Sequence, residues 1–252
     1  MKLRPLLIAC AVCAMPAANA QSIDERIAAA QSPDVMLEFA TRAGVCGNGR
    51  NIRFDDSSRN RWFEPCEYGP AHVRLRLDDG QVRSIRTFVG GSRTAGANVT
   101  DLGEVPGIEA AQWFLELART APATIAEDAI MPAAIADAPD PWRDLLAIAR
   151  NGRIDSEVRE NAVFWVGQSA AREATRELAA IVDSDTQNIE VRKAAVFALS
   201  QRDEPERTDY LLRIARTDRN AEVVAVAYFW LADAPDERAL ALFEEVLSVT
   251  ID

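Results

Sequence analysis

Three similar segments in the second half of the chain constrain its fold most strongly. They begin at Glu157, Glu190 and Glu222, so the chain repeats with a period of about 33 residues. Each segment carries apolar residues at helical spacing, and a second apolar stripe follows it within the same period. Such a period is typical of stacked helix pairs, which bury their apolar faces mainly against their neighbours. The sequence therefore predicts a mostly α-helical protein built around an α-solenoid.

About four helix pairs are predicted within residues 122–252. Their second helices share an apolar stripe at positions i, i+3 and i+4. The stripes begin at Leu145, Leu178, Leu211 and Phe243. Pro132 lies inside the leading helix of the first pair, which is the least regular of the four. One further helix is expected within residues 104–121, after Val105-Pro106, where it would link the array to the preceding residues and cover its first apolar face.

The repeated segments contain the pattern D-x-E-V-R-x-x-A from Asp155 to Ala162, with a near copy from Ile189 to Ala195. With the recurring stripes, this pattern resembles the HEAT repeat family, specifically the short bacterial type also seen in phycobilisome lyases, over residues 122–249. The resemblance implies a solenoid whose first helices form the convex side and whose second helices form the concave side. It also implies that binding of partner proteins is the usual role.

The same resemblance assigns six residues to packing between adjacent repeats. These residues are Val158, Arg159, Ala162, Val191, Arg192 and Ala195. The third copy has Val224 in place of the arginine, so any pairing of arginines between repeats is expected to stop there.

The first 20 residues predict an export signal. Lys2 and Arg4 form a charged start, residues 6–15 an apolar stretch too short to span a bilayer, and Ala18-Asn19-Ala20 a cleavage site of small residues. Cleavage at the lipoprotein-like Leu7-Ile8-Ala9-Cys10 would leave an unusually short apolar segment. We therefore expect a signal peptide over residues 1–20 and a periplasmic or extracellular protein without an integral membrane segment.

The charge balance makes nucleic acid an unfavourable partner. The chain has 28 basic and 39 acidic residues, for a net charge of −11, whereas nucleic-acid-binding proteins present basic surfaces. Its apolar fraction of 48% is that of a packed protein rather than a disordered one.

Residues 21–103 differ from the repeats and are predicted to form a small β-rich domain. Residues 72–77 alternate apolar and charged side chains, residues 78–81 have turn chemistry, and residues 82–89 form a second β-rich run, which together predict a hairpin. Residues 35–39 fit either a strand or a helix. We favour a strand, because a hairpin alone is marginally stable in water and needs a third strand to build a hydrophobic face.

Cys46 and Cys66 are the cysteines that remain after residue 20. In an exported protein they are expected to form a disulfide within the small domain. The alternative, a reactive thiol, lacks both a CxxC motif and a neighbouring histidine that would activate a thiolate.

Aromatic residues occur in the loop next to Cys66 and in the first helices of the repeats. In the loop, Trp62 and Tyr68 are candidates for ligand contact, although Trp62 and Phe63 are favoured as cover for one face of the small sheet. In the repeats, three phenylalanines occupy one position and two tryptophans the next. They are Phe164, Phe197 and Phe229, with Trp165 and Trp230. An aromatic ladder that binds a ligand is one interpretation, and we favour packing in the core.

The reactive residues argue against an enzyme. His72 is the only histidine, and its place on an alternating strand favours a solvated or hydrogen-bonded side chain over a base. The sequence contains no GxSxG, HExxH or phosphate-binding glycine loop. Residues 183–188 superficially match a calcium loop, but Asn188 and Ala194 replace its glycine and glutamate. We therefore expect no catalytic residues, no metal site and no cofactor.

Two functions fit this sequence. The first is a non-enzymatic, exported interaction scaffold that binds a protein partner on the concave face of the repeats. The alternative is an envelope enzyme or ligand-binding protein that acts on sugars or peptides through its N-terminal domain.

The exposed face of the second helices carries the residues predicted to bind the partner. Positions two before, two after and five after each aligned leucine lie opposite the buried stripe. The charged residues at these positions are Arg143, Arg150, Arg176, Asp183, Asp209, Arg213 and Arg216. Because guanidinium groups bind carboxylates bidentately, this face would select an acidic protein segment. The alternative is a solvated face whose arginines pair with Glu173, Glu177 and Glu206.

Overall fold

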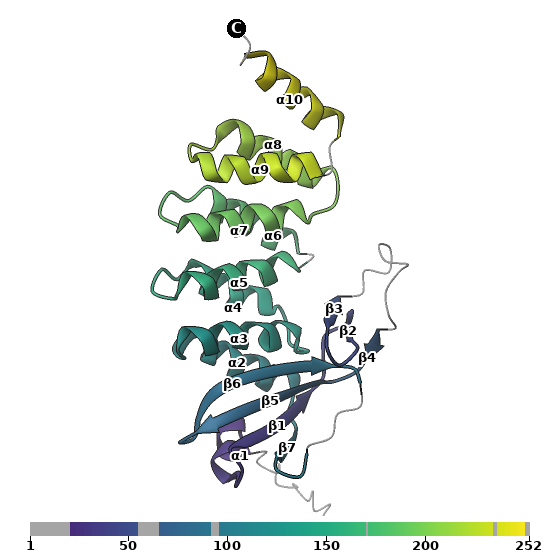
Figure 1. Cartoon of the computed structure of the whole chain (residues 1–252), viewed down its shortest axis with the longest axis vertical. Coiled ribbons are helices and arrows are strands. Elements are labelled where there is room, and N and C mark those ends of the chain that lie inside the picture. The colour runs from purple at the N-terminus through teal and green to yellow at the C-terminus, as the bar shows by residue number, and fades with distance from the viewer. Residues whose placement is uncertain (1–20, 55–65, 92–95, 170, 234–235, 250–252) are drawn as a thin grey trace, which may run out of the picture.

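A computed structural model describes residues 21–54, 66–91, 96–169, 171–233 and 236–249 (Figure 1). Two small sheets lie at one end of a stack of helix pairs, which extends away from them to the C-terminal end. This arrangement confirms the predicted class, a helical solenoid preceded by a β-rich region with one disulfide. The predicted signal peptide, residues 1–20, and the candidate contact residue Trp62 lie outside the described residues.

The larger sheet has the strand order β6-β5-β1-β7. Its strands are β1 (Asp34–Phe39), β5 (Ala71–Asp78), β6 (Gln81–Val89) and β7 (Thr100–Glu104). The predicted hairpin is β5–β6, and the ambiguous residues 35–39 form a strand that pairs with β5 on one side and β7 on the other. Burial explains this outcome, because Val35, Leu37 and Phe39 alternate along β1 and all lie in the core.

A short helix and a second sheet complete the β-rich region. Helix α1 (Ile23–Ala29) begins at Ser22, whose hydroxyl accepts a hydrogen bond from the Glu25 amide in a capping box. The second sheet has the order β3-β2-β4, with β2 (Val45–Gly47), β3 (Ile52–Phe54) and β4 (Glu67–Tyr68). The predicted disulfide between Cys46 and Cys66 lies in this sheet.

The two sheets meet where the end of β6 approaches β2. The Gly49 amide donates a hydrogen bond of 2.9 Å to the carbonyl oxygen of Val89. A Cβ atom at position 47 would lie only 2.2 Å from that same oxygen, so this approach requires glycine.

We expect Gly47→Ala to lower the free energy of unfolding by roughly 2 kcal/mol, because the added methyl group forces two backbone segments apart. Gly152→Ala is the matched control, since a Cβ there meets nothing within 4 Å. Its effect should stay within about 0.5 kcal/mol. Thermal denaturation measures both, and equal stability of the two variants would show that the close approach is not a constraint.

The helices follow the predicted order, with one linking helix and then four pairs. The linking helix is α2 (Gly107–Thr120). The pairs are α3 (Ala123–Ile135) with α4 (Pro141–Arg150), α5 (Ser156–Gly167) with α6 (Arg172–Val182), α7 (Ile189–Ser200) with α8 (Glu206–Thr217), and α9 (Ala221–Asp233) with α10 (Glu237–Val249). The first helices α5, α7 and α9 lie one above another along the molecule (Figure 1).

The same capping chemistry starts each of the three repeated first helices. The side chains of Asp155, Asn188 and Asn220 each accept a hydrogen bond from the amide two residues later. The turns before these helices differ in length, but each ends in a polar side chain that caps the helix, and the apolar residues of each pair are left to form the core.

One continuous hydrophobic core joins the sheets to the helices. The rings of Phe39 on β1 and Phe114 on α2 lie 6.1 Å apart. Two backbone hydrogen bonds cross the same junction, from the Arg42 amide to the Ile135 carbonyl at 2.9 Å and from the Asp137 amide to the Ala40 carbonyl at 2.8 Å. The domain boundary predicted after residue 103 thus passes through a shared core. Separate folding of residues 21–103 and of the helices stays a prediction.

Candidate functional site

Arg159 and Arg192 connect consecutive repeats from inside the array. The Nε atom of Arg159 donates to the Ala149 carbonyl at 3.0 Å, and that of Arg192 donates to the Val182 carbonyl at 2.7 Å. Both carbonyls belong to the end of the preceding second helix, where the helix dipole favours a positive charge. Each guanidinium also reaches forward, to Gln187 and to Asp218 respectively.

The other residues predicted to pack between repeats are also buried. They are Val158, Ala162, Val191 and Ala195. Burial lowers the pKa of the Arg159 guanidinium, and the carboxylate of Glu160 partly offsets this effect. This set therefore holds the repeats together and leaves no side chain free for a partner.

The charged residues predicted to bind a partner lie on the solvent-exposed face of the second helices, where all of them form ion pairs. Two of these pairs lie within one helix or its cap: Arg143–Asp140 at 3.6 Å and Arg176–Glu173 at 3.6 Å. The other pairs join consecutive second helices: Arg150–Glu177, Asp183–Arg213 at 2.7 Å, Asp209–Arg238, and the longer Arg216–Glu245 at 4.0 Å. The carboxylates offset the arginine charge, so an acidic partner would have to compete with them.

The first helices expose aromatic side chains, which is closer to the less favoured of the two interpretations of the sequence. Phe229 is 63% exposed and Phe164 is 37% exposed, whereas Phe197 and Trp230 are half-buried. We call these four residues the aromatic strip. The expectation that they pack in the core was wrong for Phe164 and Phe229. Small residues cause this difference, because valine and alanine fill the positions of α5, α7 and α9 that face neighbouring helices.

Ring contacts connect the strip across three repeats. The rings of Phe164 and Phe197 are nearly parallel, with centroids 6.3 Å apart, and Trp230 lies 5.1 Å beyond Phe197. At the other end, the ring of Trp165 contacts Phe164 at 5.4 Å and Phe54 of β3 at 5.3 Å. Trp165 itself is buried, as predicted. The strip therefore starts at the junction with the smaller sheet and continues to the last repeat.

Carboxylates lie beside the strip on the same helices. Glu160 precedes Phe164 by one helical turn, which places both on one face of α5. Burial, together with the neighbouring carboxylates of Glu190 and Glu157, raises the pKa of Glu160. Lys193 pairs with Glu190 at 2.8 Å and with Glu222 at 3.6 Å. The border of the strip is therefore predominantly acidic.

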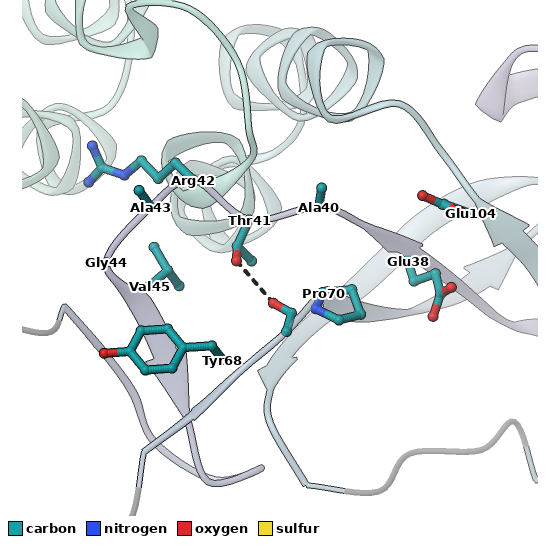
Figure 2. Close-up of a pocket in the computed structure, with 11 residues that line it drawn as sticks. Glu38, Ala40, Thr41, Arg42, Ala43, Gly44, Val45, Tyr68, Pro70 and Glu104 are labelled. Carbon is teal, nitrogen blue, oxygen red and sulfur yellow. Dashed lines mark hydrogen bonds between the residues drawn. The ribbon is translucent and has the colours of Figure 1, made fainter.

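A separate cavity of about 530 Å³ opens between the end of β1 and the smaller sheet (Figure 2). Tyr68, the described member of the predicted loop contacts, lines it, and so do Glu38 and Glu104. The Thr41 hydroxyl donates a hydrogen bond of 3.0 Å to the Gly69 carbonyl and holds the two walls together. Figure 2 shows both glutamates at the end of the cavity away from Tyr68.

The cavity lining mixes polar and apolar residues. Arg42 is directed away from the opening toward the helices, where its guanidinium lies 4.7 Å from the Phe54 ring centre, and burial lowers its pKa. His72 lies on β5, with Nδ1 3.3 Å from the Glu38 carboxylate. Within the described part of the chain, no three His, Cys, Asp or Glu side chains are grouped so that they could hold a metal ion.

Comparison with known proteins found a match to one family model over part of the chain. A model described as HEAT repeats matches residues 143–232, a span that includes the aromatic strip and the ion-paired second helices. No curated protein and no solved structure matches the chain. In the residues that the structure describes, no helix combines the length and the apolar character needed to cross a membrane.

Proposed function

We propose that this chain, whose residues 143–232 are HEAT repeats, is an exported, non-enzymatic scaffold that binds a partner protein. HEAT repeats are generally protein-interaction scaffolds, and the aromatic strip is the observation that carries the proposal for this chain. Exposed apolar residues in a contiguous row mark interaction surfaces, and aromatic side chains dominate the binding energy of many interfaces.

The border of the strip favours a partner segment that combines apolar and basic side chains. Burial and the neighbouring carboxylates of Glu190 and Glu157 raise the pKa of Glu160, and a cationic partner group would favour its charged form. Arginine or lysine can also lie over an exposed aromatic face, where the ring attracts the cation. Such a partner differs from the acidic segment expected from the arginines of the second helices.

The concave face of second helices is the alternative surface of the same scaffold. It offers Arg143, Arg150, Arg176, Asp183, Asp209, Arg213 and Arg216. An acidic segment would bind there only by exchanging the internal carboxylates for its own, and exposed ion pairs of this kind contribute about 0–1 kcal/mol each. We therefore place the partner on the aromatic strip.

Capture of partners from the envelope fraction tests this placement. Phe164→Ser with Phe229→Ser should weaken capture at least about tenfold, because aromatic hot spots contribute about 2 kcal/mol or more each. Ile108→Ser is the matched control, since this side chain is 50% exposed on α2, outside the strip. It should leave capture unchanged, and circular dichroism should show equal helical content in all variants.

A second pair of substitutions examines the alternative surface. Arg176→Glu with Arg213→Glu reverses two charges on the second helices and should leave capture by the strip intact. Loss of capture in this variant, with full capture by the phenylalanine variant, would move the partner to the concave face.

The cavity of Figure 2 supports a second candidate function, binding or processing of a sugar or peptide through the N-terminal domain. Its volume of about 530 Å³ lies in the range of small-molecule sites, and Tyr68 provides an exposed aromatic face. Tyr68→Ala should not alter partner capture by the strip. If capture fails in this variant alone, the function belongs to the N-terminal domain.

A further inference from the structure

The solvent-facing side of the larger sheet brings three arginines together. Arg74 on β5 and Arg86 on β6 lie directly opposite each other, and Arg76 follows on the same face of β5, opposite Ser84. Like charges directly opposite each other on neighbouring strands are destabilising. This pairing therefore needs a compensating negative charge.

One carboxylate supplies part of that compensation. Asp34 on β1 lies 3.3 Å from an Nη atom of Arg74 and 3.7 Å from one of Arg76, so two guanidinium groups share it. Among the described residues, no carboxylate pairs with Arg86. Three positive charges against one negative leave a local excess of about two, on a chain whose net charge is −11.

A hollow of about 210 Å³ lies among these side chains. Its lining consists of Asp34, Arg74, Arg76, Ser84 and Arg86. This volume exceeds that of several water molecules, so it has room for a tetrahedral oxyanion and part of its hydration shell. Guanidinium groups present planar forks of N–H donors that match phosphate oxygens, and the Ser84 hydroxyl adds another donor.

We propose that this hollow binds a phosphate group, either as inorganic phosphate or as the phosphate of a larger molecule. A phosphate monoester carries close to two negative charges at neutral pH, which balances the local excess. It also has enough oxygens to accept hydrogen bonds from more than one guanidinium at a time. A second carboxylate would leave one positive charge uncompensated and would duplicate the interaction that Asp34 already makes.

Titration of the full-length protein with inorganic phosphate, followed by calorimetry at low and constant chloride, tests the proposal. The wild-type protein should show one saturable site, and Arg86→Gln should weaken binding about tenfold through loss of charge-assisted hydrogen bonds. Arg83→Gln is the control, because Arg83 lies on the same strand and pairs with Asp78 at 3.3 Å outside the hollow. It should bind phosphate as the wild type does.

Vesicles that contain phosphatidic acid, compared with vesicles of phosphatidylcholine alone, distinguish the source of the phosphate. Retention on the first kind that depends on Arg86 identifies a lipid headgroup, and saturable binding of inorganic phosphate without retention identifies a soluble ligand. If Arg86→Gln does not fold, Arg76→Gln replaces it. Arg76 is the more exposed of the two arginines that pair with Asp34, so its replacement should disturb the fold least. Absence of saturable phosphate binding by the wild type, or equal affinity in the wild type and the Arg86 or Arg76 variant, would overturn the proposal.

Discussion

Asp218→Ala is expected to lower the free energy of unfolding by about 3–5 kcal/mol. The carboxylate of Asp218 lies 2.6 Å from the guanidinium of Arg192, and their side chains are only 6% and 9% exposed. Without Asp218, the arginine keeps its charge in the interior with one carbonyl partner, that of Val182. Asp218 also accepts a hydrogen bond from the Asn220 amide before α9, so the start of that helix loses support as well.

The preceding repeat provides the matched control. Gln187 lies where Asp218 does, and its side-chain oxygen accepts a hydrogen bond from Arg159. Gln187→Ala removes a neutral partner from a similarly buried arginine, so a smaller loss of about 1–3 kcal/mol is expected. Urea denaturation measures both variants, and equal losses would show that the buried charge pair is not the cause.

Replacing both partners of the buried pair gives a further test of that cause. Arg192→Met together with Asp218→Leu removes both charges and fills the space with apolar atoms. Most of the lost stability should return, because a buried ion pair rarely exceeds a well-packed apolar pair in net contribution. A double variant that is as unstable as Asp218→Ala would instead point to the hydrogen bonds that Arg192 makes with the backbone.

The sequence pointed to Arg159 and Arg192 as packing residues but not to the residues that they bind. The repeated pattern places Arg159 and Arg192 at equivalent positions, and the resemblance to HEAT repeats implies that both pack between adjacent repeats. Gln187 and Asp218 differ in type and lie 28 and 26 residues away, in turns outside the repeated segment. A contact of that kind depends on how adjacent repeats stack, which periodicity does not specify.

The aromatic strip shows a second limit of sequence patterns. Phe164 and Trp165 are adjacent and equally apolar, yet Trp165 is buried under Phe54 and Phe164 is exposed. The difference arises from the smaller sheet, whose position against α5 could not be inferred from the repeats. The third repeat differs again, because Trp230 rather than the aligned Phe229 contacts the ring of Phe197, at a tilted angle of 43°. Helices α7 and α9 start at aligned residues, Ile189 and Ala221, so the repeat alignment alone does not predict this exchange.

A helix-capping motif in the N-terminal sequence marks a helix that the alternating pattern of this region does not predict. Ser22 and Glu25 form a capping box that marks the start of α1, and this spacing is visible in the sequence. The cavity of Figure 2 is different, since its walls come from residues 38–45, 68–70 and 104. Strand pairing brings these segments together, so their proximity could be recognised only from the fold.

Reduction of the Cys46–Cys66 disulfide is expected to destabilise the smaller sheet by about 3 kcal/mol while the repeats stay folded. The bond closes a loop with a sequence separation of 20, and loops of that size restrict the unfolded chain by about this amount. Both cysteines lie in the region of β2 and β4, whereas the larger sheet is held by its own strand pairing and by the shared core with α2 and α3. The opening should therefore be local.

Hydrogen exchange with and without reductant measures where the chain opens. Amides of β2 and β3 should exchange faster after reduction, and those of β1, β5 and the repeats should remain protected. The Cys46→Ser variant, untreated, should reproduce the reduced pattern. Faster exchange throughout the repeats would contradict local opening.

Limited proteolysis of the reduced protein then distinguishes two divisions of the chain. If residues 21–103 form a separate domain, as the sequence predicts, proteolysis should remove them and leave a resistant fragment that begins near residue 104. The structure favours a larger protected unit, because the Arg42–Ile135 and Ala40–Asp137 backbone hydrogen bonds and the Phe39–Phe114 contact join β1 to the first helices. Protection of β1 and β5 after cleavage within the smaller sheet would establish that the larger sheet is the cap of the repeat array, since a terminal repeat needs a cover for its apolar face.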